Sequence, residues 1–329
     1  VVNVVLFVLS KTKPQNDHNI VAYRLIGINS ATEKDRYLKN SLRSNNPKAP
    51  ISISQTDLFE IPDYQLLYWL PKDLLNAFKK YPLLEETAGT TDGVTGLARL
   101  TRFDWEVPLT KKGRWVPYSK GGGYARWSGL EHYCCDWQYD GSRQKAYIDA
   151  YYPYLKGNYG FRLKYRGIFP KVAFCFSSFS SGGICCRLLE SGAIIGDKGP
   201  AVIPKNASGE LLLSILNTRV PNYLLRAISG INQVQYPYVL KVPVVDIENK
   251  LERVSILNIQ NLCLKTKMRI LDYEELILRH YSQSFPNTGQ SSVIASNRGT
   301  LHEMITYSVY ILLLESALER YVASRYGLA

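Results

Sequence analysis

The chain has 329 residues, 46% of them hydrophobic, so it can bury a sizeable core in two domains or in one large one. Its 40 Lys and Arg outnumber its 28 Asp and Glu, which gives a net charge of +12 and a pI near 9.3. This excess favours a polyanionic partner, either nucleic acid or an acidic membrane surface. The apolar runs at 1–9 and 309–314 are too short to span a bilayer, and no secretion signal is recognisable, so we expect a cytoplasmic protein outside the membrane.

The first 88 residues are predicted to combine two strands with one helix. Residues 1–11 are β-branched and nearly all apolar, which predicts a strand covered on both faces, and 20–28 predict a second strand. Residues 30–50 are polar with two prolines, which indicates a loop or linker with room for one helical turn. The amphipathic stretch 72–81 predicts a helix that Pro71 begins. The chain opens in the first strand and not at a Met, which suggests a fragment of a longer protein.

From about residue 89 the composition shifts towards Gly, Tyr, Trp, Lys and Arg. Between 94 and 205 the apolar pieces are short, aromatic or β-branched, and are separated by Gly, Asp and Ser. We find no long helical period there, so this block is predicted to be mostly β.

Helical periodicity returns after Pro204. Residues 210–230 predict a helix kinked at Pro221 or a pair of helices, whereas the prolines in 236–247 favour a short extended stretch. The Ser, Asn and Gly of 282–299 predict a loop. A capping box at residues 300–303 then begins a long helix that runs to about residue 325 and ends at Gly327.

The cysteine and histidine pattern does not indicate a metal site. Six cysteines include two adjacent pairs but no C-x-x-C spacing, and the four histidines lie far apart. A zinc site needs four convergent ligands, which close spacing usually announces. We expect no metal, and cysteines packed as small reduced hydrophobic residues in a cytosolic protein.

The basic residues gather in two windows that are also rich in aromatic residues. Residues 111–127 hold five basic residues, four aromatic ones and no acid, and 143–171 hold seven basic residues, eight aromatic ones and one acid. Lys and Arg neutralise phosphates, glycine lets the backbone approach a phosphate closely, and rings stack on exposed bases. The pattern predicts a face that binds nucleic acid. The alternative is a solvated basic face of a β-rich domain whose rings belong to the core.

No motif in these windows indicates catalysis. The stretch KGGGY (120–124) lacks the spacing of a phosphate-binding loop and no helical pattern follows it, and GVTG (93–96) and GDKGP (196–200) read as ordinary turns. No Ser/His/Asp or Cys/His arrangement stands out. We therefore expect no catalytic residue, no cofactor-binding residue and no metal ligand in this chain.

Four blocks of the sequence are informative together. They read GVTGLARLTRFDWEVP (93–108), RWVPYSKGGGYARWSGLEHYCCDWQYDG (114–141), FCFSSFSSGGICCRLLESGAIIGDKGPAVIP (174–204) and LLSILNTRVPNYLLRAISGINQVQYPYVLKVPV (212–244). In this order they resemble the region that follows the catalytic domain in large adenine-specific DNA methyltransferases, namely the PglX enzymes of BREX phage-defence systems and their type IIG/IIL restriction-modification relatives. Residues 1–11, 61–71 and the terminal YGL extend the resemblance to nearly the whole chain.

This resemblance implies an α+β fold in three parts. They are the end of a methyltransferase α/β sheet with a connector (1–88), a β-rich target-recognition domain (89–205), and helices that close the molecule (206–329). The Asn/Asp-Pro-Pro-Tyr/Phe tetrapeptide that binds the flipped adenine in such enzymes is absent, as is their glycine-rich S-adenosylmethionine loop. The chain alone is therefore predicted to be inactive, although its parent enzyme would use S-adenosylmethionine.

The resemblance and the basic windows together predict sequence-specific recognition of double-stranded DNA, with a methyltransferase catalytic domain, and possible further defence-system subunits, as partners. Trp127 is expected to shape the site more than to touch bases. The predicted DNA-binding residues are Lys111, Lys112, Arg114, Lys120, Gly121, Gly122, Arg126, Trp127, Arg162, Lys164 and Arg166. Three alternatives stay open at this point: a protein–protein interaction module of a defence complex, a complete but diverged methyltransferase, and a basic RNA-binding module.

Overall fold

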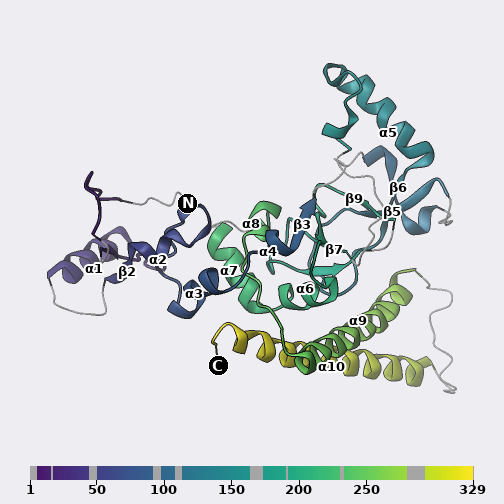
Figure 1. Ribbon diagram of the computed structural model, residues 1–329. Coiled ribbons are helices and arrows are strands. Elements are labelled where there is room, and N and C mark those ends of the chain that lie inside the picture. Colours follow the sequence, from purple (N-terminus) through teal and green to yellow (C-terminus); the bar gives the residue numbers. More distant parts are fainter. Residues whose placement is uncertain are drawn as a thin grey trace. The chain divides into compact units, whose positions relative to one another are not determined.

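A computed structural model describes residues 6–15, 18–43, 50–91, 98–107, 113–163, 173–189, 192–229, 233–279 and 293–328. The chain divides into two compact units, Val1–Lys79 and Lys80–Ala329 (Figure 1). Helices and sheets are both present, so the predicted α+β class is confirmed. The three-part domain division stays a prediction.

The first unit is built on one short antiparallel ladder. Strands β1 (Asn19–Ala22) and β2 (Ile51–Ser54) pair with Asn19 opposite Ser54. The helical elements of this unit are α1 (Ala31–Arg43), α2 (Gln55–Phe59), the 3₁₀ turn η1 (Pro62–Tyr64) and α3 (Lys72–Lys80). Helix α3 is confirmed where the sequence predicts it, and the carbonyl of Pro71 accepts hydrogen bonds from the N–H groups of its first turn. That helix buries Leu74 and Phe78.

Two expectations for this unit are wrong. Residues 6–10 form no regular element, and Leu6 and Val8 are 92% and 95% exposed, because no strand in the described residues pairs with them. The predicted linker at 30–50 contains helix α1 of 13 residues. Its polarity concealed it, although the hydroxyl of Ser30 caps its first turn at the N–H of Glu33.

The second unit contains two four-stranded sheets. One has the order β3 (Ala88–Thr91), β10 (Ala201–Pro204), β7 (Phe174–Phe176), β8 (Cys186–Leu188), and all its pairs are antiparallel. The other has the order β4 (Thr101–Phe103), β6 (Tyr133–Asp136), β5 (Trp115–Ser119), β9 (Ile194–Ile195), and its last pair is parallel. The β-rich block is thus present between residues 88 and 204.

Helices follow the sheets along the chain. They are α6 (Gly209–Leu216), α7 (Arg219–Ser229), α8 (Tyr236–Leu240), α9 (Lys250–Arg279) and α10 (Val293–Arg325). Helices α9 and α10 lie side by side along their length (Figure 1). Short elements precede them: α4 (Leu84–Thr87), η2 (Ala98–Leu100), η3 (Asp104–Glu106), α5 (Gln138–Tyr151), η4 (Pro153–Leu155) and η5 (Tyr159–Phe161).

The core of this unit includes helix α6, which contacts strands β8 and β10 and packs against α7 and α9. Phe174, Phe176 and Leu213 are fully buried, and so is Trp127, at 1% exposure. All six cysteines are buried as free thiols, as the sequence predicts. Burial raises the pKa of the Cys134 thiol to about 11, which keeps that thiol protonated at neutral pH.

Several boundaries differ from those predicted. Helix α5 interrupts the β block after a left-handed turn at Tyr139–Gly141, and the 30-residue α9 was not anticipated. The pair α6 and α7 is confirmed, but it breaks at Asn217 because Pro221 sits in the first turn of α7, where its missing N–H costs little. Residues 236–240 are helical and not extended, with Pro237 again in the first turn.

The last helix also differs from its prediction. Helix α10 begins at Val293, before the predicted capping box, so residues 293–299 are helical. The remainder of the predicted loop, 282–292, lies outside the described residues. The C-terminal end is confirmed: Gly327 has φ +79°, and the N–H of Leu328 closes the last turn on the carbonyl of Ala323.

Candidate nucleic-acid interface

Two glycine-rich loops interlock at the end of the second sheet. Strand β5 runs into Ser119–Gly123 and strand β9 runs into Gly196–Pro200, and because these strands are parallel both loops leave the same edge. The N–H of Gly196 donates to the carbonyl of Ser119 at 2.9 Å, and the Ser119 hydroxyl donates to the carbonyl of Gly199 at 3.0 Å.

Glycine is required where the loops touch. Gly121 has φ +73°, and a Cβ there would lie 1.9 Å from the carbonyl oxygen of Lys198. A Cβ at Gly199 would lie 2.4 Å from the carbonyl oxygen of Ser119. Gly122, at φ +89°, has open space around it and leaves its backbone accessible. The glycines therefore bring two loops, each with one lysine, into contact.

These loops border an open groove of about 660 Å³. Its cations are Arg102, Lys120 and Lys198, and its acids are Glu106 and Asp197. The Glu106 carboxylate accepts a hydrogen bond from the N–H of Phe103 at 2.7 Å. Asp197 forms an ion pair with Lys198, with 3.6 Å between its Oδ2 and the lysine Nζ. The lining residues are Thr101, Arg102, Phe103, Glu106, Tyr118, Lys120, Gly121, Gly122, Tyr133, Phe179, Asp197 and Lys198.

Aromatic rings stand beside both lysines. The Lys120 ammonium lies 4.1 Å from the centroid of the Tyr133 ring, and the Lys198 ammonium lies 5.4 Å from the Phe179 ring. Phe103 stacks on Tyr133 at 5.0 Å and on Trp105 at 4.4 Å. The groove thus combines the two ingredients predicted from the sequence, positive charge and flat rings.

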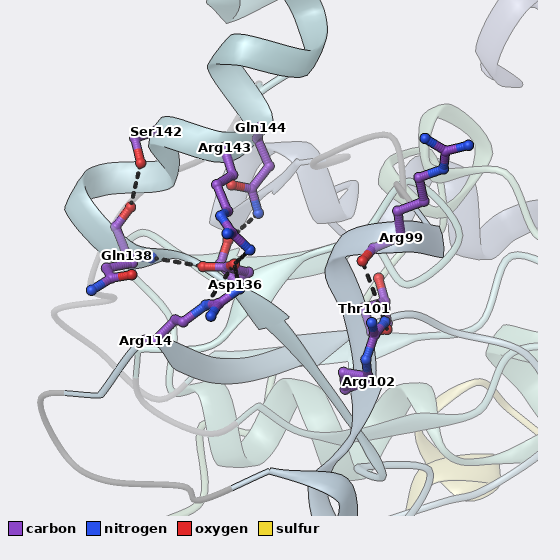
Figure 2. A network of polar contacts seen from close by, with 9 residues as sticks. All are labelled: Arg99, Thr101, Arg102, Arg114, Asp136, Gln138, Ser142, Arg143 and Gln144. Carbon is purple, nitrogen blue, oxygen red and sulfur yellow. Dashed lines mark hydrogen bonds and ion pairs between the residues drawn. The ribbon is translucent and has the colours of Figure 1, made fainter.

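A buried carboxylate forms ion pairs with two of the arginines. Asp136 is fully buried, and its Oδ2 lies 2.6 Å from Nη2 of Arg114 and 3.2 Å from Nη1 of Arg143 (Figure 2). The hydrogen bond that Arg114 donates to the Asp136 carboxylate raises the pKa of Arg114. In the same view Arg102 bends back, and its Nη1 donates to the carbonyls of Arg99 and Thr101 at 3.3 and 2.8 Å.

A second carboxylate, Glu315 of helix α10, holds the segment after the glycines. Its Oε2 pairs with Nη2 of Arg126 at 2.7 Å, and its Oε1 accepts from Nε1 of Trp127 at 2.7 Å. Arg126 also donates to the carbonyl of Asn217, whose side chain hydrogen-bonds both backbone groups of Cys186. Arg126 and Trp127 therefore connect the segment after the glycine loop to helix α10 and to Asn217 at the end of helix α6.

A buried arginine supports the first glycine loop. Arg187 is 1% exposed, and its Nη1 donates to the Ser177 hydroxyl at 3.2 Å. That hydroxyl donates in turn to the carbonyl of Gly122 at 3.4 Å. No sequence pattern singles out Arg187 or Ser177.

The predicted DNA-binding residues separate into three groups. Lys120, Gly121 and Gly122 line the groove. Arg114, Arg126 and Trp127 make the internal contacts above, and Arg162 lies outside the groove lining, 4.3 Å above the ring of Tyr152. Lys111, Lys112, Lys164 and Arg166 lie outside the described residues.

Nine of the twelve lining residues were not selected from the sequence, among them Arg102, Phe103, Phe179 and Lys198. Phe179 and Lys198 come from segments 59 and 78 residues after Lys120, and the GDKGP stretch was read as an ordinary turn. Arg102 and Phe103 belong to a quoted block but carry no signal of their own. Over the described residues, no cluster of three or more His, Cys, Asp or Glu side chains could hold a metal ion. Within the same residues no helix has the length and apolar character to cross a membrane.

The chain is related in sequence to adenine-specific methyltransferases. One relative is the adenine-specific methyltransferase PglX of Lacticaseibacillus casei (strain Zhang), 23% identical over 261 residues, which are 74% of this chain and 21% of PglX. Another is the adenine-specific methyltransferase BrxX of Escherichia coli O9:H4 (strain HS), 25% identical over 215 residues, which are 62% of this chain and 16% of BrxX. The resemblance stated from the sequence blocks is thereby confirmed.

The chain spans about a fifth of the length of these relatives. No protein-family model matches it. Among solved structures, the type IIL restriction-modification enzyme MmeI in complex with DNA superimposes with a TM-score of 0.44 at 14% identity, over 75% of this chain and 34% of MmeI.

Proposed function

We propose that this chain is the DNA-recognition part of an adenine-N6 DNA methyltransferase of a phage-defence or restriction-modification system. One observation carries the proposal: two interlocked glycine loops present Lys120 and Lys198 to an open groove lined by exposed rings. A net charge of +12 and kinship with adenine-specific methyltransferases support the same partner.

In this proposal the groove lies against duplex DNA. The two lysines neutralise phosphates and release counterions, and those contacts fix the register of the protein on the duplex. Gly121 and Gly122 let the backbone approach the phosphates without an intervening Cβ. Sequence is read by side chains that reach base edges from this frame.

Methyl transfer is assigned to the part of the relatives that this chain does not span. S-adenosylmethionine would bind there, and this chain would select the adenine that is modified. The partners proposed are therefore double-stranded DNA and a methyltransferase catalytic domain.

Selection from a random pool tests the proposal. The purified chain is mixed with duplexes that carry a randomised 12-base-pair core, and the bound fraction is sequenced. We expect enrichment of one short motif. Lys120→Ala/Lys198→Ala should weaken retention of the pool, whereas Lys72→Ala/Lys265→Ala removes the same charge at exposed sites outside the groove and should leave retention unchanged. A wild-type chain that retains no duplex, or that enriches no motif, contradicts sequence-specific recognition.

A further inference from the structure

Three aromatic rings near the groove form a continuous stack. Phe103 and Trp105 lie almost parallel, at 7° and 4.4 Å between centroids, and Phe103 meets Tyr133 at 5.0 Å and 29°. Lys120 lies over the ring of Tyr133 at 4.1 Å. The three rings come from β4, η3 and β6, so the sheet itself holds the stack in place.

This stack is only partly covered. Phe103 is 36% exposed and Trp105 is 57% exposed, although burial would stabilise each ring by removing apolar area from water. Phe179, which lines the same groove from another segment, is 52% exposed beside Lys198. Large rings kept at a concave cationic surface are typical of a binding site and not of a core.

Phosphate contacts alone would not need these rings. In an intact duplex the faces of the bases are covered by their neighbours, and rings on a protein cannot stack on them. A base that has left the stack presents a flat face, and aromatic side chains beside a positive groove are the usual way to bind it. The groove volume of about 660 Å³ falls within the range of sites that enclose an organic ligand.

We propose that the groove binds one unpaired base of the DNA, stacked against Phe179, while Lys120 and Lys198 contact the flanking phosphates. This inference rests on the proposed function, since it assumes that DNA occupies the groove. It assigns the Phe179 ring to the unpaired base and the lysines to the backbone, so the two contributions can be removed separately.

The test compares two DNA molecules that differ in one base. One is a fully paired 25-base-pair duplex, and the other carries a single unpaired adenine at its centre. We expect the wild-type chain to bind the second about tenfold more tightly, which corresponds to about 1.4 kcal/mol. 2-Aminopurine at the unpaired position should lose fluorescence on binding, because stacking on a ring quenches it.

Variants separate rings from charge. Phe179→Leu keeps apolar volume but removes the ring, and it should lower affinity for the DNA with the unpaired base about tenfold more than affinity for the paired duplex, so that the preference is lost. Lys120→Ala/Lys198→Ala should weaken binding of both DNA molecules equally. Phe59→Leu removes an exposed ring of the other unit, at 53% exposure, and should change neither result.

Equal affinity of the wild-type chain for the two DNA molecules would overturn this inference while leaving the proposed function intact. So would a Phe179→Leu variant that lowers both affinities by the same factor. Failure to bind either DNA would instead contradict the proposed function.

Discussion

Lys120 and Arg126 are six residues apart and belong to one basic, aromatic stretch, yet they lie in opposite environments. Lys120 borders the open groove with its ammonium over a ring. Arg126 is fastened to Glu315 of α10, and the neighbouring Trp127 is buried against the same carboxylate. The comparison teaches that one basic stretch of sequence can supply both a lysine that faces an open groove and an arginine that is fixed by an acid of the fold.

Much of the charge counted in the two basic windows has internal partners. Arg114 and Arg143 share Asp136, and Lys145 pairs with Asp140 at 2.7 Å. These acids lie between the windows in sequence, but strand β6 and helix α5 bring them to the basic residues. The groove, in contrast, takes its second lysine from a distant loop. The predictions below separate an inward cluster (Arg126, Trp127, Glu315) from the groove.

The largest expected effect is on stability, at the centre of the inward cluster. Trp127→Ala should lower the free energy of unfolding by about 3–5 kcal/mol, because it empties a fully buried site and removes the hydrogen bond to Glu315. Trp105→Ala, at a ring 57% exposed, should cost less than about 1 kcal/mol. Urea denaturation measures both, and equal losses would contradict the division into inward and outward residues.

Adjacent glycines should differ in the groove. Gly121→Ala forces a Cβ against the carbonyl of Lys198. This variant should lower the free energy of unfolding by about 3 kcal/mol and should also lose DNA binding. The Cβ of Gly122→Ala has no atom within 4 Å, so only the positive φ at this position disfavours the variant. The free energy of unfolding should fall by about 1 kcal/mol. Thermal melting and duplex affinity test the pair. If the two variants behave alike, the loops are not interlocked as described.

A smaller effect is expected in thiol chemistry. Burial and the Glu315 carboxylate raise the pKa of Cys263 to about 12, so this thiol should alkylate slowly at pH 8. Glu315→Gln removes the negative charge, which lowers the pKa of Cys263 and should speed its alkylation. Mass spectrometry of the Cys263 peptide gives the rate, with the Cys134 peptide as internal control. An unchanged ratio would show that Glu315 does not act on this thiol.

The sequence predicted local features well where one segment decides them. Helix α3 follows from Pro71 and a clear apolar period, and the helix pair after Pro204 follows from a broad apolar face. Helices α1 and α5 were not predicted. The residues of α1 are mostly polar, and α5 contains a glycine within a left-handed turn, so neither helix shows a clear apolar period.

The candidate site was only half predictable, for a physical reason. Lys120, Gly121 and Gly122 come from one visible motif, but Phe179 and Lys198 join them only through the parallel pairing of β5 with β9. Likewise, nothing local connects Arg126 with Glu315, which lies 189 residues away. Strand pairing and ion pairs between distant segments decide which charges face solvent, and these pairings cannot be predicted from composition.

The most direct test of the account is the salt dependence of duplex affinity. Lys120→Ala/Lys198→Ala should reduce the slope of log affinity against log salt concentration by about 2, because two phosphate contacts are lost. Arg126→Ala should leave the slope unchanged, because the Arg126 guanidinium is paired with the Glu315 carboxylate and not with a phosphate. This variant should lower thermal stability instead. A slope that falls in Arg126→Ala and stays constant in the lysine variant would contradict the assignment of DNA binding to the groove.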